Sequence, residues 1–427
     1  MTVRAVAAGF AVAALLPLAA AGQAPAGSCR DPRVVRQPAD LERAVEQFAQ
    51  AARLAPRDAR PLLERGVCLE RLARHEAALS DFNAAVVLDP ALAQARIDRA
   101  RLSARLGRLD NAEADSGEAL RLDAASIDAR LGRGEVLAAL RRHAEALRDF
   151  DAVLQGNPRH LPALQGRGAS RAALDQVEPA IADFDAALAI DASFAPAHLG
   201  RGEALARAGR HDAALKDFDA YVALRAEDSY GRFRRALAMA RTGDAARAIE
   251  DLGEAIRLEP RMVSAYVERG RLLARGGQAE RAISDFGEAI ALAPKYAAAW
   301  RFRGMAQYRA GRHDLALADL TEALRLDAKD SVARNELAWL LATSPKDAVR
   351  DGRLAVDLAR AAAEQSGWKN PGLLDTYAAA LAEAGQFAEA VKWQQQALEL
   401  PGLAGEAKAG AEQRLRLYRE GKPYRTP

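Results

Sequence analysis

Small and apolar residues recur along this chain with a period of 34 residues. Alanine occupies one position of the period nine times without a gap, at residues 44, 78, 112, 146, 180, 214, 248, 282 and 316. Four residues after each alanine lies a Phe or Leu, with Ser116 as the exception. Within each period the apolar residues fall into two runs with spacings of three and four, which predicts two amphipathic helices per period.

Glycine and proline mark the same places in successive periods. When the repeated alanine is numbered position 20, Gly or Ala lies at position 8, Gly often at position 15, and Pro or Ala at position 32. Small residues let two helices approach closely, glycine ends a helix, and proline cannot continue one. A single helical hairpin cannot bury its apolar face, so we expect the hairpins to stack.

At these residues the chain resembles the tetratricopeptide repeat family. The resemblance covers positions 8, 20, 24 and 32 from about residue 39 to residue 330. It implies an all-α fold, an α-α superhelix or solenoid of antiparallel helix hairpins. We expect an N-terminal capping helix at 39–58, eight regular repeats at 59–330, two irregular repeats at 331–403 and a C-terminal capping helix with its tail at 404–427.

The N-terminus has the pattern of an export signal. Arg4 precedes an uncharged, alanine-rich run that ends with three small residues at 19–21. This pattern predicts a cleaved signal peptide at 1–21 and a flexible segment at 22–38. The run is less apolar than a membrane span requires, although an uncleaved anchor and lipid attachment at Cys29 remain alternatives. We therefore expect an exported bacterial protein, periplasmic or secreted, without a membrane span once the signal is removed.

Composition excludes several classes of protein. The 61 basic residues nearly balance the 58 acidic residues, and no basic run with interleaved aromatic residues occurs, which argues against nucleic acid as a partner. Cys29 and Cys68 are too few for a cysteine zinc site. In an oxidising compartment these two cysteines can join the N-terminal segment to the first helix of the first hairpin, or Cys68 can be a buried thiol.

Two charged positions repeat as regularly as the apolar ones. Arginine occupies position 7 and aspartate position 23 in the same eight repeats, from Arg65 and Asp81 to Arg303 and Asp319. Pairing within a repeat leaves neither residue without a partner, so we predict an Arg–Asp ion pair across each hairpin. The alternative is an acidic ladder that binds calcium, but calcium sites need oxygens clustered in a shaped loop.

No residues form a recognisable catalytic, metal or cofactor motif. Four histidines fall at position 17 of different repeats, where we expect the second helix to begin, and they are too far apart to share an ion. No phosphate-binding loop or nucleophile elbow is present. Trp339, Trp368 and Trp393 leave open an enzyme site in the irregular segment 331–400, although aromatic residues at helical spacing more often form a core. We expect a non-enzymatic protein without a cofactor.

The resemblance also implies a binding surface. In the family, positions 2, 5, 9 and 12 of the first helices line a concave groove. From positions 5 and 9 the candidate residues are Leu63, Val67, Ile97, Arg101, Leu131, Glu135, Leu199, Glu203, Phe233, Leu237, Val267, Arg271, Arg301 and Met305. Position 5 is largely apolar and position 9 has charges of both signs, which favours a peptide or an amphipathic helix over a polyanion.

Two interpretations of position 5 stay open, because its residues can also pack between neighbouring helices. The function that the pattern favours is a scaffold for protein–protein interaction, with an unidentified protein or peptide partner bound in the groove. The alternatives are a binder of cell-wall glycan or another envelope polymer, and an enzyme with a site in the segment 331–400.

Overall fold

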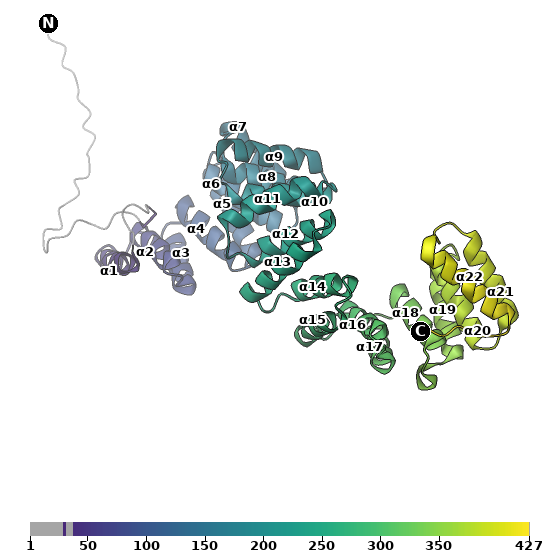
Figure 1. The fold of residues 1–427 in the computed structure, drawn as a ribbon. Coiled ribbons are helices and arrows are strands. Elements are labelled where there is room, and N and C mark those ends of the chain that lie inside the picture. The colour runs from purple at the N-terminus through teal and green to yellow at the C-terminus, as the bar shows by residue number, and fades with distance from the viewer. Residues whose placement is uncertain (1–28, 31–36, 427) are drawn as a thin grey trace, which may run out of the picture. The chain divides into compact units, whose positions relative to one another are not determined.

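A computed structural model describes residues 29–30 and 37–426 of the chain. The predicted signal peptide and nearly all of the predicted flexible segment lie outside these residues. Throughout the described part every regular element is a helix, so the predicted all-α fold is confirmed. The chain divides into two compact units, Met1–Ala187 and Leu188–Pro427, each of which is a series of packed helices (Figure 1).

The first unit begins with a single helix, α1, which packs against the first hairpin. Three hairpins follow, formed by α2 with α3, α4 with α5 and α6 with α7, and then come α8 and most of α9. The helices are α1 (Pro38–Leu54), α2 (Arg60–Arg71), α3 (His75–Leu88), α4 (Ala93–Arg105), α5 (Leu109–Leu122), α6 (Ile127–Ala139), α7 (His143–Gly156), α8 (Leu161–Ala173) and α9 (Val177–Ile190).

The second unit contains four more regular hairpins and then becomes irregular. Its regular helices are α10 (Ala195–Arg207), α11 (His211–Leu224), α12 (Ser229–Thr242), α13 (Ala245–Leu258), α14 (Val263–Arg275), α15 (Ala279–Leu292), α16 (Ala297–Arg309) and α17 (His313–Leu326). The later helices are α18 (Ser331–Thr343), the short 3₁₀ helix η1 (Asp347–Val349), α19 (Gly352–Gln365), α20 (Pro371–Glu383), α21 (Phe387–Glu399) and α22 (Gly405–Arg419).

The turn inside each regular hairpin has one residue with a left-handed backbone. Glycine fills this place at position 15 of five repeats, as the sequence predicts, with φ between 72° at Gly311 and 94° at Gly243. In the other three repeats Ala73, Arg141 and Asp175 adopt the same conformation, with φ of 57°, 62° and 61°. The turn therefore persists without glycine, at the conformational cost that a side chain brings in this region.

Position 8 and position 24 pack directly against each other across the hairpin. A Cβ atom added to the glycine at position 8 would lie between 2.5 Å and 2.9 Å from the ring of the Phe at position 24, at Gly66, Gly134, Gly168, Gly202 and Gly270. Where position 8 is Ala100 or Ala236, position 24 is Ser116 or Leu252. The small residue thus leaves the space that the aromatic ring fills, and Gly304 with Leu320 shows that a glycine at position 8 also packs against a leucine.

The end of the second unit is less regular than the repeats before it. Gly352 is the first residue of α19, and the loop before it contains η1. The rings of Trp368 and Trp393 stack with centroids 4.6 Å apart, and Tyr377 meets both edge-on. After α22 the chain returns to α18, where the Thr426 amide donates to the Thr343 carbonyl oxygen.

Among the residues that the structure describes, no helix combines the length and the apolarity that crossing a bilayer would require.

Candidate partner-binding pocket

The repeated arginine and aspartate pair within each hairpin, so that prediction is confirmed. In all eight repeats the guanidinium donates two hydrogen bonds to the carboxylate, over N–O distances of 2.5 to 3.1 Å. The aspartates are only 2% to 6% exposed. Hydrogen bonds to Asp81 raise the pKa of the Arg65 guanidinium above its ordinary value. These carboxylates hold the hairpins together and do not form a ligand ladder.

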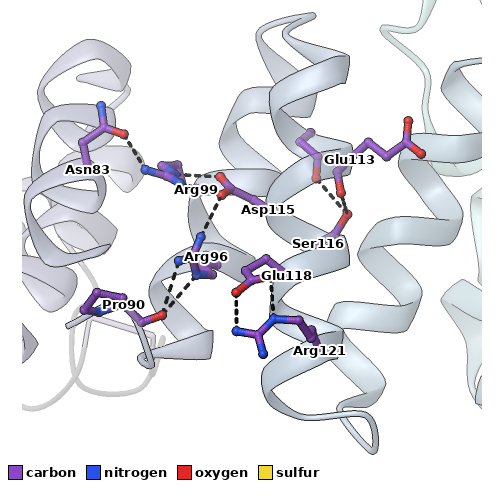
Figure 2. Close-up of polar contacts among 10 residues, drawn as sticks. Asn83, Pro90, Arg96, Arg99, Glu113, Asp115, Ser116, Glu118 and Arg121 are labelled. Carbon is purple, nitrogen blue, oxygen red and sulfur yellow. Dashed lines mark hydrogen bonds and ion pairs between the residues drawn. The ribbon is translucent and has the colours of Figure 1, made fainter. Parts of the chain in front are cut away.

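The second repeat shows how the pair is extended to its neighbours (Figure 2). Arg99 binds Asp115 on the next helix and also donates to the Asn83 side chain of the previous repeat at 2.9 Å. Arg96 lies 3.6 Å from the same carboxylate and donates to the Pro90 carbonyl oxygen. The hydroxyl of Ser116, which replaces Phe at position 24, donates a hydrogen bond to the Ala112 carbonyl oxygen at 2.7 Å. The exception in the pattern therefore buries no unpaired hydroxyl.

Position 5 divides into buried and half-buried residues. Leu63, Ile97 and Val267 are 4% to 6% exposed and belong to core clusters, so the packing interpretation holds for these three. Leu131, Leu199 and Phe233 are half-buried. Arg301 lies 3.3 Å from both Asp330 and Glu336, so its charge is used inside the protein.

Position 9 has a different environment. In the second unit, Glu203, Leu237 and Arg271 line one pocket of about 610 Å³. They come from α10, α12 and α14, the first helices of three consecutive repeats. We call this site the α12 pocket, and the lining residues that matter here are Glu203, Arg207, Arg234, Leu237, Arg241, Glu268, Arg271, Leu272 and Arg275. The structure thus brings together three of the predicted residues at the register that the family resemblance implied.

Other predicted position 9 residues lie outside this pocket. Glu135 is exposed on α6, and Met305 packs partly buried against the core of the irregular segment. Val67 and Arg101 line a separate pocket in the first unit together with Cys29 and Arg30. The candidate residues therefore do not form one uniform surface.

Residues 29–30 form part of the wall of the first-unit pocket. Cys29 and Cys68 form a disulfide, which decides between the bonded and free alternatives and attaches residues 29–30 to α2. Arg30 binds the buried carboxylate of Asp98 through two nitrogens and lies 3.4 Å from Glu64. The Arg71 guanidinium donates to the Cys29 carbonyl oxygen at 2.6 Å. Side chains of the first two repeats thus contact residues 29–30 of the same chain.

Position 13 is the feature of the α12 pocket that we did not predict. Arginine occupies it in six of the eight regular repeats, and three of these arginines, Arg207, Arg241 and Arg275 in the last turn of α10, α12 and α14, line the pocket. Their spacing of 34 residues is visible in the sequence, and a search of every position for recurring charge would have found it. The family resemblance implies groove residues at positions 2, 5, 9 and 12 only, so position 13 was not among the predicted positions.

The acidic residues of the α12 pocket already have basic partners. Arg234 lies 2.8 Å from Glu203, which also accepts a hydrogen bond from the Tyr230 hydroxyl at 2.7 Å. Burial and this hydrogen bond raise the pKa of Tyr230. Arg271 lies 2.8 Å from Glu268 one turn earlier on α14. By contrast, Arg241 and Arg275 are exposed and contact no carboxylate within the residues that the structure describes.

The histidines and tryptophans take positions that give them structural roles. The four histidines at position 17, His75, His143, His211 and His313, are each the first residue of their helix, as predicted. Across residues 29–30 and 37–426 no three His, Cys, Asp or Glu side chains gather into a metal-binding group. Trp339, Trp368 and Trp393 are partly buried against the core of the irregular segment, where the Trp339 indole donates to the Tyr308 hydroxyl.

Several solved structures are similar to this chain. They include a tetratricopeptide repeat protein from Parabacteroides merdae, at 23% identity and a TM-score of 0.47, covering 58% of this chain and 98% of that one. Yeast Tom70 is similar at 15% identity and a TM-score of 0.39, covering 90% and 93% of the two chains. The Cut9-Hcn1 complex of the APC/C is similar at 15% identity and a TM-score of 0.49, covering 81% and 84%.

Sequence comparison identifies the family directly. No curated protein matches the chain. The sequence profile described as Tetratricopeptide repeat matches residues 39–93, 97–160, 163–229, 233–294 and 268–331, which together make up most of the chain. Together with the 34-residue hairpins and the packing of position 8 against position 24, this match shows that the chain belongs to the tetratricopeptide repeat family.

Proposed function

We propose that this protein is a non-enzymatic scaffold that binds a segment of a protein partner in the α12 pocket. Tetratricopeptide repeat proteins in general mediate protein–protein interactions. The observation that carries the proposal is the convergence of Glu203, Leu237 and Arg271, from three consecutive repeats, on one pocket of about 610 Å³.

The composition of the pocket fits a peptide segment. Leu237 and Leu272 supply apolar surface, while charged side chains surround them. A bound peptide can bury apolar side chains in such a site and place its polar groups on the charged rim. All of these residues lie on helices, which hold them at fixed spacing and reduce the entropy lost on binding.

Site-specific photo-crosslinking tests this proposal. Leu237 is replaced by p-benzoylphenylalanine in the full chain, which is irradiated in an extract of the cells that produce it. The matched control places the same group at Leu315 on α17, an exposed leucine outside the pocket. We expect discrete protein adducts from Leu237 that the control lacks. Identical adduct patterns at the two positions, or adducts at neither, would overturn the proposal.

We further propose that the protein is exported and that residues 1–21 are cleaved in the process. Arg4 and the apolar run up to residue 21 support this, and so does the Cys29–Cys68 disulfide, because disulfides persist in oxidising compartments. The disulfide also uses the Cys29 sulfur that lipid attachment would need. The intact mass of the protein recovered from its cells tests the proposal: a chain that begins at Gly22 supports it, and a chain that retains residues 1–21 contradicts it.

A further inference from the structure

We propose that the α12 pocket selects partner segments that carry carboxylates. This inference rests on the proposed function and specifies the chemistry of the partner. The pocket is lined by five arginines and only two glutamates. Glu203 lies 2.8 Å from Arg234 and Glu268 lies 2.8 Å from Arg271, so the positive charge that no carboxylate of the described residues contacts is that of Arg241 and Arg275.

These arginines form a row with one member on each first helix. Arg207, Arg241 and Arg275 occupy the same position of three consecutive repeats, so the row runs in the direction in which the hairpins follow one another. Arg241 and Arg275 are exposed, and no carboxylate of the described residues contacts them. A guanidinium of this kind binds a carboxylate through two parallel hydrogen bonds.

Arginine at position 13 could serve only to stabilise its helix, and the other repeats of the chain test this explanation. Position 13 lies in the last turn of its helix, where a positive charge interacts favourably with the helix dipole. In the first unit, however, α6 and α8 end with Ala139 and Ala173 at this position, and both helices form. The repeat therefore does not need an arginine there. Arg71 and Arg105 occupy the same position outside the pocket, but Arg71 donates to the Cys29 carbonyl oxygen and Arg105 lies 2.9 Å from Glu70, whereas no carboxylate of the described residues contacts Arg241 or Arg275.

The other residues of the pocket favour an acidic peptide over a continuous polyanion. Glu203 and Glu268 would repel the evenly spaced phosphates or sulfates of a nucleic acid or a sulfated glycan. Leu237 and Leu272 lie among the charges and offer apolar surface that such polymers cannot use. A segment in which carboxylates alternate with apolar side chains matches both features.

Fluorescence anisotropy with the full chain tests the inference. The probe is a fluorescein-labelled peptide of Glu-Glu-Ala-Leu repeats, and its matched control is the Gln-Gln-Ala-Leu peptide. We expect the Glu peptide to bind and the Gln peptide to bind about tenfold more weakly or not at all. Added salt should weaken the Glu complex, because exposed ion pairs are screened.

Matched variants locate the interaction. Replacing Arg241→Gln and Arg275→Gln together should weaken the Glu peptide about tenfold, since two carboxylate contacts are lost. The control, Arg225→Gln with Arg261→Gln, removes the same charge from two exposed turn residues outside the pocket and should leave binding unchanged. Far-ultraviolet circular dichroism confirms that both variants are folded.

Three outcomes would overturn the inference. The first is equal affinity for the Glu and Gln peptides, and the second is equal weakening by both pairs of substitutions. The third is tighter, Arg241-dependent binding of heparin or a single-stranded oligonucleotide, which would point to a polyanion. Each outcome is separate from the photo-crosslinking at Leu237, which can succeed with a partner of any charge. Failure of the charge inference is therefore distinguishable from failure of the proposed function.

Discussion

Eight aspartates remain charged inside this protein because each has an arginine beside it. A buried carboxylate without a partner is strongly unfavourable, whereas a buried pair has a net energy close to that of an apolar pair of the same size. The pair consequently adds little to the free energy of unfolding, but removing either partner leaves the other as a buried, unpaired charge. At the scale of single residues, this explains why no repeat in the sequence has one without the other.

A double-mutant cycle at Arg133 and Asp149 tests this argument. Arg133→Leu alone should lower the free energy of unfolding by about 3 kcal/mol, because Asp149 is then buried and unpaired. Arg133→Leu with Asp149→Leu should cost less than that single change. Urea unfolding of the full chain measures both, and Arg121→Leu, which breaks an exposed pair with Glu118, is a control that should hardly move the midpoint. Additive costs of the two single changes would contradict the pairing.

Glu336 provides a pH-dependent test at the same scale. Burial raises the pKa of this carboxyl from 4.5 to about 7, against the opposing charge of Arg301. The folded chain therefore holds the proton more tightly than the unfolded chain. Its stabilising contribution is complete below about pH 4.5 and is lost as the pH rises through 7.

Glu336→Gln should remove this dependence. We expect the variant to gain on the order of 2 kcal/mol over the wild type at pH 8 and to lose that advantage at pH 4.5. Urea midpoints at the two pH values measure the effect, with the exposed Glu288→Gln as the control. A wild-type chain whose stability changes no more than that of Glu336→Gln across this window would contradict the assignment.

Helices meet in this structure through a small residue on one and a large residue on the other. Gly168 on α8 lies against Phe184 on α9, where an added Cβ would be 2.9 Å from the ring. The combinations Ala100 with Ser116 and Ala236 with Leu252 show that the same contact is satisfied when both residues change. At the scale of elements, complementary volume and not the identity of either residue sets the distance between the helices.

Gly168→Ala should therefore destabilise the protein by about 1 to 3 kcal/mol through overpacking. Adding Phe184→Leu should recover much of the loss, as the natural pair Ala236 and Leu252 indicates. Gly132→Ala on α6 is the matched control, because nothing lies within 4 Å of its added Cβ, and it should stabilise the helix slightly. Thermal unfolding compares the three variants, and equal effects of the two alanines would contradict the packing argument.

At the scale of the whole molecule, each hairpin inside a compact unit packs mainly against the hairpins before and after it in that unit. Stability in such a protein is approximately a sum over repeats and their interfaces. The two compact units, Met1–Ala187 and Leu188–Pro427, are both built on this principle. The length of 427 residues is thus reached by repetition, and no single core has to serve the entire chain.

Deletion of one full period tests this additivity. Removing residues 127–160 takes out α6 and α7 with both members of their ion pair and keeps every other position in register. We expect a folded protein with an unchanged helical fraction by circular dichroism. Removing residues 127–143 instead leaves α7 without its partner helix and should cause aggregation. Equal behaviour of the two deletions would show that the repeat is not the unit of stability.

Sequence alone determined the hairpins, their order and the ion pair inside each one, because these depend on contacts between residues a fixed distance apart within one repeat. It also identified Glu203, Leu237 and Arg271 as candidates by their register. Only the tertiary structure decided that Leu63, Ile97 and Val267 are buried. It also decided that Arg30 lines the first-unit pocket and binds Asp98, and that Arg207, Arg241 and Arg275 line the α12 pocket. Exposure and pocket formation depend on how neighbouring repeats pack together, which the pattern within one repeat does not specify.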